Sequence, residues 1–403
     1  MPTVREIVED FAKEIQSKKI STAKPSTTVI KFRTDIKDGI ERPVEKVPLE
    51  CLRFRKDNGR IASDVMDHEK KVGPLDEKDL NSQTTIRHFL ANKDPEKTNI
   101  LTKTIMHEGQ REPAIITCDG FLVDGNRRKV VMDKLHEEYP GHEEYEYMKV
   151  VILPGAGDEG GPPTLLEIEK IENRIQLQSD GRSEYYKFDR AISIVRKIET
   201  GFSLEEQLSD DPQYAGASKA ELARAVRNYE RDYLRPLECI DRYLHHFHRD
   251  GLYSTVSSGI SDREGRWQAF SDYSKSYDSC FNNPRKRLKL GIEEEDIGAI
   301  EDAAFKMIRL RVLKGLPKLY TIMRDLPKWC GNDLSKKEIL EISDEVDETL
   351  PQEEYFDKDG DALSMEDIDS KWAAKYQQPI IHHAKKASQY FDDQAEQETP
   401  INL

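Results

Sequence analysis

In the middle of the chain's first half, the apolar positions switch between strand spacing and helix spacing. Ala114–Thr117 and Phe121–Asp124 are apolar runs of strand length, and the Asp119-Gly120 pair between them is typical of a hairpin turn. The run Lys129–Leu135 carries its apolar residues at helix spacing, and Met148–Leu153 is again an apolar strand. This order predicts an α+β domain in which short strands pair beside a helix.

Further elements are expected on the N-terminal side of this region. Helix-spaced apolar residues predict an amphipathic helix over residues 2–18, and the polar segment 21–28 that follows indicates a linker. Residues 47–53 indicate an early strand, and residues 101–106 indicate part of a helix. The stretch 62–100 is charged and rich in turn residues, so we interpret it as an elaboration of the domain outside its core.

After a glycine- and proline-rich loop at residues 155–163, the pattern becomes helical up to residue 250. Residues 185–198 carry apolar positions with a helical period. Two later helices, expected at 203–208 and 218–229, begin with capping boxes, in which a Ser at the helix start is followed three residues later by a Glu. This part of the chain therefore predicts a mainly α-helical region.

The second of these capped helices and the residues just after it carry a basic face. Its members are Lys219, Arg224, Arg227 and Arg231. Two short helices joined by a turn, the second presenting cations, are typical of a helix-turn-helix motif that binds DNA. The alternative is a helical bundle with ordinary surface arginines, because acidic residues at positions 221, 230 and 232 dilute the face. The sequence leaves both interpretations open.

Positive and negative charge separate toward the end of the chain. Basic residues gather at 283–289 and 306–328, whereas residues 341–370 hold thirteen Asp or Glu and one Lys. The second basic stretch predicts either a surface that contacts phosphate backbones or a bundle helix with a solvated basic side. The acidic stretch is expected to be mostly irregular and mobile, either competing for the basic helix or forming a solvated tail.

Composition limits the class of protein. A chain of 403 residues is long enough for two or three domains, and 36% hydrophobic against 34% charged residues indicates sizeable solvated segments. The net charge of −15 is unevenly distributed, so it does not argue against nucleic acid. No apolar run approaches the ~20 residues of a membrane helix. The five isolated cysteines lack metal-ligand spacing and indicate a reducing, cytoplasmic location.

These patterns predict five parts of the chain. They are an N-terminal helix and linker (1–44), an α+β domain (45–163), a helical domain with the possible helix-turn-helix (164–250), a helical domain with the basic helix (251–335) and an acidic, partly disordered tail (336–403).

The clearest candidate chemistry lies where the second strand of the hairpin ends. The run Asp124-Gly125-Asn126-Arg127-Arg128 brings one carboxylate and two guanidiniums to a tight turn, and a helix is expected to begin at the arginines. The unpaired N–H groups of a helix N-terminus favour an anion such as phosphate, and arginines add charged donors. The run therefore predicts a phosphate-binding site. The alternative is a hairpin and helix whose arginines are merely solvated.

In its order of elements, the region 45–180 resembles the N-terminal domain of the ParB/sulfiredoxin superfamily. In that domain a helix leads through Gly-x-x-x-Pro into a strand, and an arginine-rich box and a short acidic-Asn box follow. This sequence has Gly109–Pro113, Asp124–Arg128 and Glu172-Asn173 at the corresponding places. The resemblance implies a small mixed sheet with helices, followed by a mainly α-helical region.

The resemblance also implies a nucleotide pocket. The residues that would bind CTP or ATP are Gly109, Gly125, Asn126, Arg127, Arg128 and Asn173. Asp124 or Glu172 would position magnesium or an attacking water, with Glu172 as the metal ligand. The sequence departs from the partition branch of the family at position 126, where that branch has Glu, and at Gln176, which lies one residue too late. The choice between CTP and ATP therefore stays open.

The favoured function is nucleotide-dependent DNA binding, in which CTP or ATP with magnesium gates DNA engagement or the closure of a homodimer. One alternative is an enzyme on the same fold, a small-molecule kinase, NTPase or nuclease of a phage-defence or mobile-element system. A second alternative is a scaffold with a degenerate pocket. Sulfiredoxin chemistry is not expected, because the arginine box holds no cysteine. The histidines at positions 245, 246 and 248 are expected to be surface or core residues rather than metal ligands.

Overall fold

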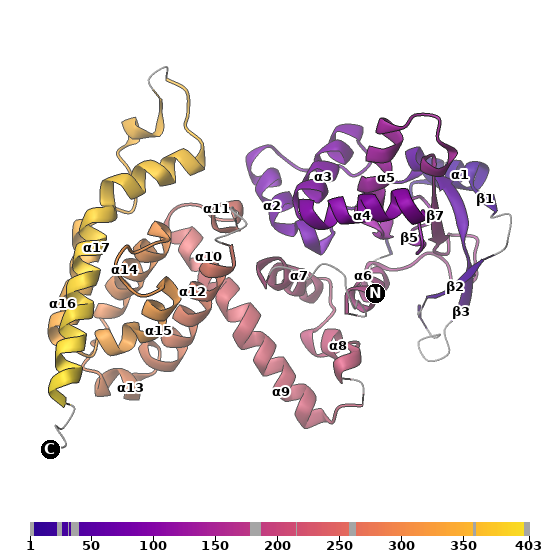
Figure 1. Ribbon diagram of the computed structural model, residues 1–403. Helices are drawn as coiled ribbons and strands as arrows, with labels where there is room; N and C mark the ends of the chain where they lie inside the picture. The colour runs from indigo at the N-terminus through magenta and orange to yellow at the C-terminus, as the bar shows by residue number, and fades with distance from the viewer. Residues whose placement is uncertain are drawn as a thin grey trace. The chain divides into compact units, whose positions relative to one another are not determined.

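The computed structural model comprises two compact units, residues 1–227 and 228–403 (Figure 1). The structure describes residues 4–21, 26–30, 32–33, 40–177, 187–214, 216–257, 263–357 and 360–398. The division between the units differs from the predicted boundaries, because it falls inside the region 164–250 that the sequence pattern treated as one domain. Helix α9 (Lys219–Tyr229) crosses this point, so no break in the helical pattern marks it.

The first unit is built on a five-stranded mixed sheet with the strand order β1-β4-β7-β5-β6. Its strands are β1 (Ile20–Ser21), β4 (Glu45–Pro48), β5 (Ala114–Ile116), β6 (Leu122–Asp124) and β7 (Tyr147–Ile152). Strands β5 and β7 pair in parallel, and the other pairs are antiparallel. A separate two-stranded sheet joins β2 (Thr27–Ile30) to β3 (Ile40–Pro43). The predicted α+β class and the hairpin around Asp119-Gly120 are confirmed.

Nine helices of the first unit's described residues surround this sheet or follow it. They are α1 (Glu9–Lys18), α2 (Ala62–Lys71), α3 (Leu80–Asn92), α4 (Pro95–Glu108), α5 (Asn126–Glu138), α6 (Leu165–Leu177), α7 (Lys187–Glu199), α8 (Leu204–Ser209) and α9. Short 3-10 turns occur at η1 (Leu49–Cys51), η2 (Gly59–Ile61), η3 (Glu143–Tyr145) and η4 (Pro212–Tyr214). In Figure 1, α3, α4 and α5 lie together beside the sheet, and their mutual contacts agree with this.

Both faces of the sheet are buried, because successive side chains of a strand point to opposite sides. In β7, Met148 and Val150 join a core packed under α2–α5, whereas Val151 packs with a second core that includes β2 and α6. The same alternation separates Ile116 from Ile115 in β5. The strands therefore read as continuous apolar runs, as strands covered on both faces do.

The segment 62–100 differs from its prediction as an elaboration outside the core. It forms α2, α3 and the start of α4, and Val65, Ile86 and Leu90 are buried in the same core as the sheet. A helix needs only a few apolar residues to bury one side. The many charged residues on the other sides of these helices therefore obscured the helical spacing of the apolar ones. The aspartates at positions 79 and 94 cap α3 and α4.

Smaller differences concern the ends of elements. The first helix begins at Glu9 rather than at residue 2, and the strand predicted at 47–53 ends at Pro48 and continues as the turn η1. Part of the predicted linker 21–28 belongs to β2, and its residues 22–25 lie outside the described residues. The helix predicted at 185–198 is α7, and its first two predicted residues are likewise outside them.

Apart from one isolated β-bridge between Phe356 and Ala362, the regular elements of the second unit's described residues are helices and turns. They are η5 (Glu230–Leu234), α10 (Arg235–His246), α11 (Ser254–Ser257), α12 (Arg263–Ser276), η6 (Tyr277–Phe281), α13 (Pro284–Lys289), α14 (Asp296–Leu310), α15 (Leu319–Trp329), α16 (Asp333–Glu345), η7 (Gln352–Tyr355) and α17 (Met365–Glu398). Their core is aromatic: Tyr243, Phe270, Tyr273 and Phe305 contact one another at ring-centroid distances of 5.1–5.8 Å. Trp267, Phe270 and Tyr273 are all buried in this core.

The region 336–403 is not a disordered tail over its described residues. Helices α16 and α17 run alongside each other (Figure 1), and α17 buries Trp372 and Ile380. Of the stretch 341–370, only residues 346–364 lie outside α16 and α17, and even there Val346 and Leu350 are buried. The acidic composition misled the prediction, because apolar residues at helix spacing suffice to bury one face of a long helix.

The basic stretch 306–328 is not a single exposed helix. Helix α14 ends at Leu310 and α15 begins at Leu319, with non-helical residues between them. Lys306 and Arg309 are buried, and they bond to Asp302 and Asp369 respectively. These two cations are therefore neutralised within the unit and do not form a phosphate-binding surface.

Candidate functional site

The predicted phosphate-binding run lines a cavity of about 480 Å³ in the first unit. The wall is formed by the turn between β6 and α5 together with η2, α3, α4 and α6. Of the residues predicted from the sequence, six line this cavity: Asp124, Gly125, Asn126, Arg127, Arg128 and Glu172. Residues that are 48 positions apart in the chain thus meet at one place, since the two predicted boxes share the cavity.

Gly125 shapes the turn from which these side chains emerge. Its φ of 97° lies in the left-handed region, and a Cβ there would lie 2.6 Å from the Ala114 Cβ. Asp124 ends β6 and Asn126 begins α5, whose N-terminus has no capping side chain. The first N–H groups of α5 therefore lack an intrahelical partner, and they give this end of the helix a partial positive charge.

Arg127 lies against the cavity rather than in open solvent. Its side chain is 19% exposed, and its nearest ion-pair partner is Asp94 at 3.7 Å. Burial, and next the neighbouring charge of Arg60, lower the pKa of Arg127 from its ordinary value. The interpretation that arginines of this turn are merely solvated is wrong for this residue. Because arginine stays charged in proteins, two mutually repelling guanidiniums face the same region.

Arg128 has a different role, because its donors bind the protein itself. Its guanidinium donates to the carbonyl oxygens of Glu112 at 2.5 Å and Pro113 at 3.1 Å, and to the Asp124 carboxylate at 2.5 Å. These bonds tie the start of α5 to the strand before the hairpin. Arg128 therefore holds the turn in shape, and Asp124 serves it as the anionic partner.

Asn126 contributes a buried polar atom to the cavity wall. The residue is 8% exposed, and its Oδ1 has no hydrogen-bond partner among the described residues. A buried amide oxygen without a partner costs free energy, which a bound donor would recover.

Glu172 reaches the cavity from α6 and is 6% exposed. Burial, together with the neighbouring Glu169 carboxylate, raises its pKa to about 7, against the opposing effect of Arg55. The Arg55 guanidinium lies 3.8 Å from the Glu172 carboxylate. The carboxyl can therefore gain or lose a proton near neutral pH.

Two residues of the predicted set do not line the cavity. Gly109 ends α4 in the left-handed conformation, with a φ of 71°. Asn173 donates to the carbonyl oxygen of Gln207 at 3.2 Å and accepts from Lys197 at 3.0 Å, so it connects α6 with α7 and α8. The prediction that Gly109 and Asn173 contact a ligand in this cavity is therefore not supported by their positions. Of these two adjacent residues of α6, Glu172 faces the cavity, whereas Asn173 faces α7 and α8.

The sequence reasoning missed several other residues that line the cavity. Arg60, Lys93 and Lys97 add positive charge, and Ile100 and Leu101 form an apolar side that Ile175 completes. Lys93, Lys97 and Ile100 belong to the segment 62–100, whose charged composition hid its helices. Lys93 bonds to Asp64 at 2.8 Å and Asp189 at 3.0 Å, whereas Lys97 is exposed.

The predicted basic face on α9 is largely exposed. Lys219, Arg224 and Arg227 are exposed, and Ala225 is the buried residue among those of α9. Arg231 lies in η5, where its guanidinium donates to the Asp232 carboxylate at 2.9 and 2.7 Å. Both predicted capping boxes are present, at the starts of α8 and α9.

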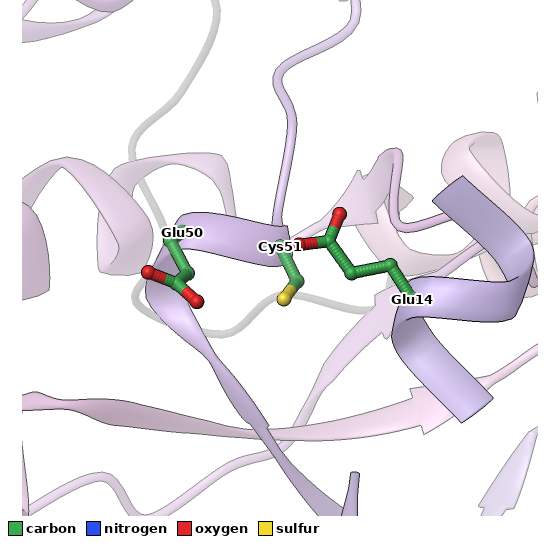
Figure 2. Close-up of side chains that lie close together, drawn as sticks. All are labelled: Glu14, Glu50 and Cys51. Carbon is green, nitrogen blue, oxygen red and sulfur yellow. The ribbon is translucent and has the colours of Figure 1, made fainter. Parts of the chain in front are cut away.

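Clusters of potential metal ligands lie outside the cavity among the described residues. One consists of Glu14, Glu50 and Cys51, and Figure 2 shows Glu14 reaching from α1 toward η1, which carries the other two. The ammonium of Lys18 already bonds both carboxylates, at 2.9 and 2.6 Å. Burial, and next the Glu14 charge, raise the pKa of Cys51 to about 11, so its thiolate is disfavoured. We therefore do not regard this group as a metal site.

Comparison of the chain with protein-family models, with characterised proteins and with solved structures found no match. No helix of the described residues is long and apolar enough to cross a membrane.

Proposed function

We propose that the cavity binds a nucleotide, CTP or ATP, with the phosphates at the N-terminus of α5. The observation that carries this proposal is the meeting of uncapped helix N–H groups, the Arg127 guanidinium and the neighbouring Arg60 at one cavity wall. A bound phosphate would accept charge-assisted hydrogen bonds and relieve the repulsion between the two guanidiniums.

The apolar residues of the lining suit the base of a nucleotide. Ile100 is 58% exposed although it is a large aliphatic residue, and Leu101 and Ile175 line the same side. A cavity of about 480 Å³ is within the range of small-molecule and cofactor sites, roughly 300–1,000 Å³. A ligand with an aromatic base and an anionic end would contact both the charged and the apolar residues of the lining.

Magnesium enters the proposal as a partner of the nucleotide rather than as a resident ion. Mg²⁺ usually binds through one or two carboxylates together with the phosphates of its substrate. In the described residues, Asp124 is bonded to Arg128, Glu172 lies beside Arg55, and no three-ligand group occurs in the cavity. These residues do not form a ready-made magnesium site. We expect the ion to arrive with the phosphates, with Glu172 as the protein carboxylate that meets it.

For the whole chain we propose nucleotide-dependent DNA binding, with the nucleotide gating DNA engagement or dimer closure, on a domain of the ParB/sulfiredoxin type. Support comes from the order of elements around the cavity and from the exposed cations Lys219, Arg224 and Arg227 on α9. Exposed cations on a helix that buries little of its own surface are accessible to phosphate backbones.

A specific observation favours a second candidate function, an enzyme that transfers or hydrolyses a phosphoryl group. Glu172 is a buried carboxyl at the cavity wall with a pKa of about 7. Such a group can accept a proton from an attacking water or hydroxyl at neutral pH. In this case Glu172→Gln should slow turnover and leave nucleotide affinity nearly unchanged.

Isothermal titration calorimetry with Arg127→Ala tests the proposed site. A hydrogen bond to a charged group contributes roughly 1.5–3 kcal/mol, so we expect nucleotide affinity to fall by at least about 10-fold. The matched control is Arg111→Ala, which removes a 69% exposed arginine outside the cavity and should leave affinity unchanged. Circular dichroism should show both variants folded.

A thermal-shift screen of the wild type with each NTP, with and without magnesium, identifies the nucleotide. Preference for CTP favours a partition-type role, and preference for ATP favours the kinase or NTPase. Unchanged affinity in a folded Arg127→Ala variant would overturn the site assignment, and the absence of any shift would favour the scaffold.

A further inference from the structure

In the second unit, the segment after α16 returns to the bundle and meets α10 and α14 around three potential ligand side chains. His246 is the last residue of α10, Asp302 belongs to α14, and Glu348 lies in the segment between α16 and η7. His246 and Glu348 are partly exposed and Asp302 is buried, and together they line an open groove on this unit. From the sequence, His246 was expected to be a surface or core residue rather than a metal ligand. Its two neighbours in this group lie more than 50 positions away in the chain.

The three side chains already have nearly the spacing of a coordinated set. The His246 Nε2 lies 2.8 Å from the Asp302 Oδ1 and 3.6 Å from the Glu348 Oε1, and all three donor atoms lie within 4.8 Å of one another. In a tetrahedral zinc site with bonds of about 2.1 Å, ligand atoms lie about 3.4 Å apart. Shifts of less than an ångström would bring the Asp302 and Glu348 oxygens to that separation from the His246 Nε2.

The Asp302 carboxylate is held in place by hydrogen bonds to the oxygen that does not face His246. The second oxygen of Asp302 accepts hydrogen bonds from the Lys306 ammonium at 2.5 Å and the Ser343 hydroxyl at 2.6 Å. Its first oxygen is thereby directed toward His246. Hydrogen bonds of this kind, made to the far side of a ligand, orient metal-binding carboxylates in proteins.

The other two ligands are positioned by the unit's core. The His246 ring packs edge-on against Phe247 and Phe305, with centroid distances of 4.8 and 5.7 Å. The backbone carbonyl of Glu348 accepts a hydrogen bond of 2.6 Å from the buried Arg309. The imidazole is therefore positioned by packing and the Glu348 backbone by a hydrogen bond, so the small adjustments that a metal requires fall on the carboxylates of Asp302 and Glu348.

The charge of the groove favours a cation despite the ammonium of Lys306. The carboxylates of Asp302 and Glu348 are joined in the lining by those of Asp344 and Asp347, against the single lysine. One imidazole and two carboxylates leave a tetrahedral position for water, and this donor set suits Zn²⁺ better than the all-oxygen sites that Ca²⁺ and Mg²⁺ prefer.

We propose that His246, Asp302 and Glu348 form a binding site for a divalent transition-metal ion of the Zn²⁺ class. The ion fastens the segment after α16 to α10 and α14. The site is separate from the nucleotide cavity, so the two proposals stand or fall independently.

The test is calorimetric titration of the full chain, freed of metal by a chelator, with Zn²⁺, Mn²⁺ and Ca²⁺. We expect one Zn²⁺ per chain, weaker Mn²⁺ binding and no Ca²⁺ binding. Removing one ligand by Glu348→Gln or His246→Gln should weaken Zn²⁺ by at least about 10-fold. The control is His245→Gln, since this neighbouring histidine is 80% exposed and pairs with Asp250 outside the group.

Two further measurements distinguish zinc bound at this site from zinc bound by cysteines. Zn²⁺ should raise the melting temperature of the wild type and of His245→Gln, but not that of Glu348→Gln, with all variants folded by circular dichroism. Cobalt substitution should give the absorption of a nitrogen–oxygen site without thiolate charge-transfer bands. The proposal would be overturned if Glu348→Gln and His246→Gln bound zinc as tightly as the wild type does. Thiolate bands, or the absence of stoichiometric binding to the wild type, would overturn it as well.

Discussion

Adjacent arginines of one motif do different work in this structure. Arg127 faces the cavity with Asp94 as its nearest ion-pair partner, whereas Arg128 is bonded to two backbone carbonyls and a carboxylate. The sequence predicted both as phosphate ligands, because identical side chains at neighbouring positions cannot be told apart without the backbone. The helix directs them differently, since consecutive residues project about a quarter of a turn apart.

The structural role of Arg128 gives a prediction about stability. Arg128→Ala removes charge-assisted bonds to Glu112, Pro113 and Asp124, so we expect the free energy of unfolding to fall by about 2–4 kcal/mol. Urea denaturation measures this, and Arg111→Ala, at an exposed site, should change it by less than about 0.5 kcal/mol. Arg128→Lys should restore little of the lost stability, because one ammonium cannot donate to all three acceptors at their separate positions. A stable Arg128→Ala variant with weakened nucleotide affinity would instead make Arg128 a ligand.

The raised pKa of Glu172 predicts an unusual dependence of stability on pH. In the unfolded chain this carboxyl titrates near 4.5, and in the folded protein near 7. Between these values the folded state holds one proton more, so its stability falls as pH rises, by about 3 kcal/mol in total for this group. Glu172→Gln removes the effect. The free energy of unfolding of the wild type minus that of the variant should therefore decline from pH 4.5 to 7.5. Urea denaturation at several pH values measures this difference. A difference that stays constant with pH would contradict the burial of this carboxyl.

At the scale of elements, the sequence predicted correctly those features that depend on a few adjacent residues. It did not predict helices that bury only a few apolar residues. The hairpin, the start of α5 and the capping boxes at Ser203 and Ser218 depend on a few adjacent residues, so the sequence revealed them. Helices α2 and α3 bury residues such as Val65 and Ile86 among many charges, and the pattern concealed them. The part of the cavity wall that α3 and α4 supply was missed for the same reason.

The basic face of α9 supplies the prediction for DNA. The double variant Arg224→Ala/Arg227→Ala should bind duplex DNA more weakly, and the slope of log K against log salt should fall by about 2, since each phosphate contact contributes roughly 0.9. Gel shifts or fluorescence anisotropy over a salt series measure both. The control Arg111→Ala/Lys134→Ala removes the same charge from exposed positions elsewhere and should leave the slope unchanged. Absence of DNA binding at low salt, with and without nucleotide, would reject the DNA role.

For the whole molecule, the net charge of −15 hides extensive internal pairing. Arg249 and Arg309 share the carboxylate of Asp369 in α17, and Arg309 also stacks on Trp372. These partners are 60 or more positions apart, so the sequence showed a basic stretch and an acidic stretch but not their mutual neutralisation. Deleting the acidic region, which the sequence suggested would free a basic helix for DNA, would instead remove part of a core.

The two compact units predict two separable unfolding transitions. Asp369→Asn would leave the buried Arg249 and Arg309 without their anion, and breaking a buried pair typically costs about 3–5 kcal/mol. In differential scanning calorimetry we expect this variant to lower the transition of residues 228–403 alone, whereas Asp392→Asn, at an exposed position of the same helix, should lower neither. A saturating nucleotide should raise only the transition of residues 1–227, because a ligand stabilises the unit that binds it. A single transition that moves with both Asp369→Asn and the nucleotide would show that the two units unfold as one.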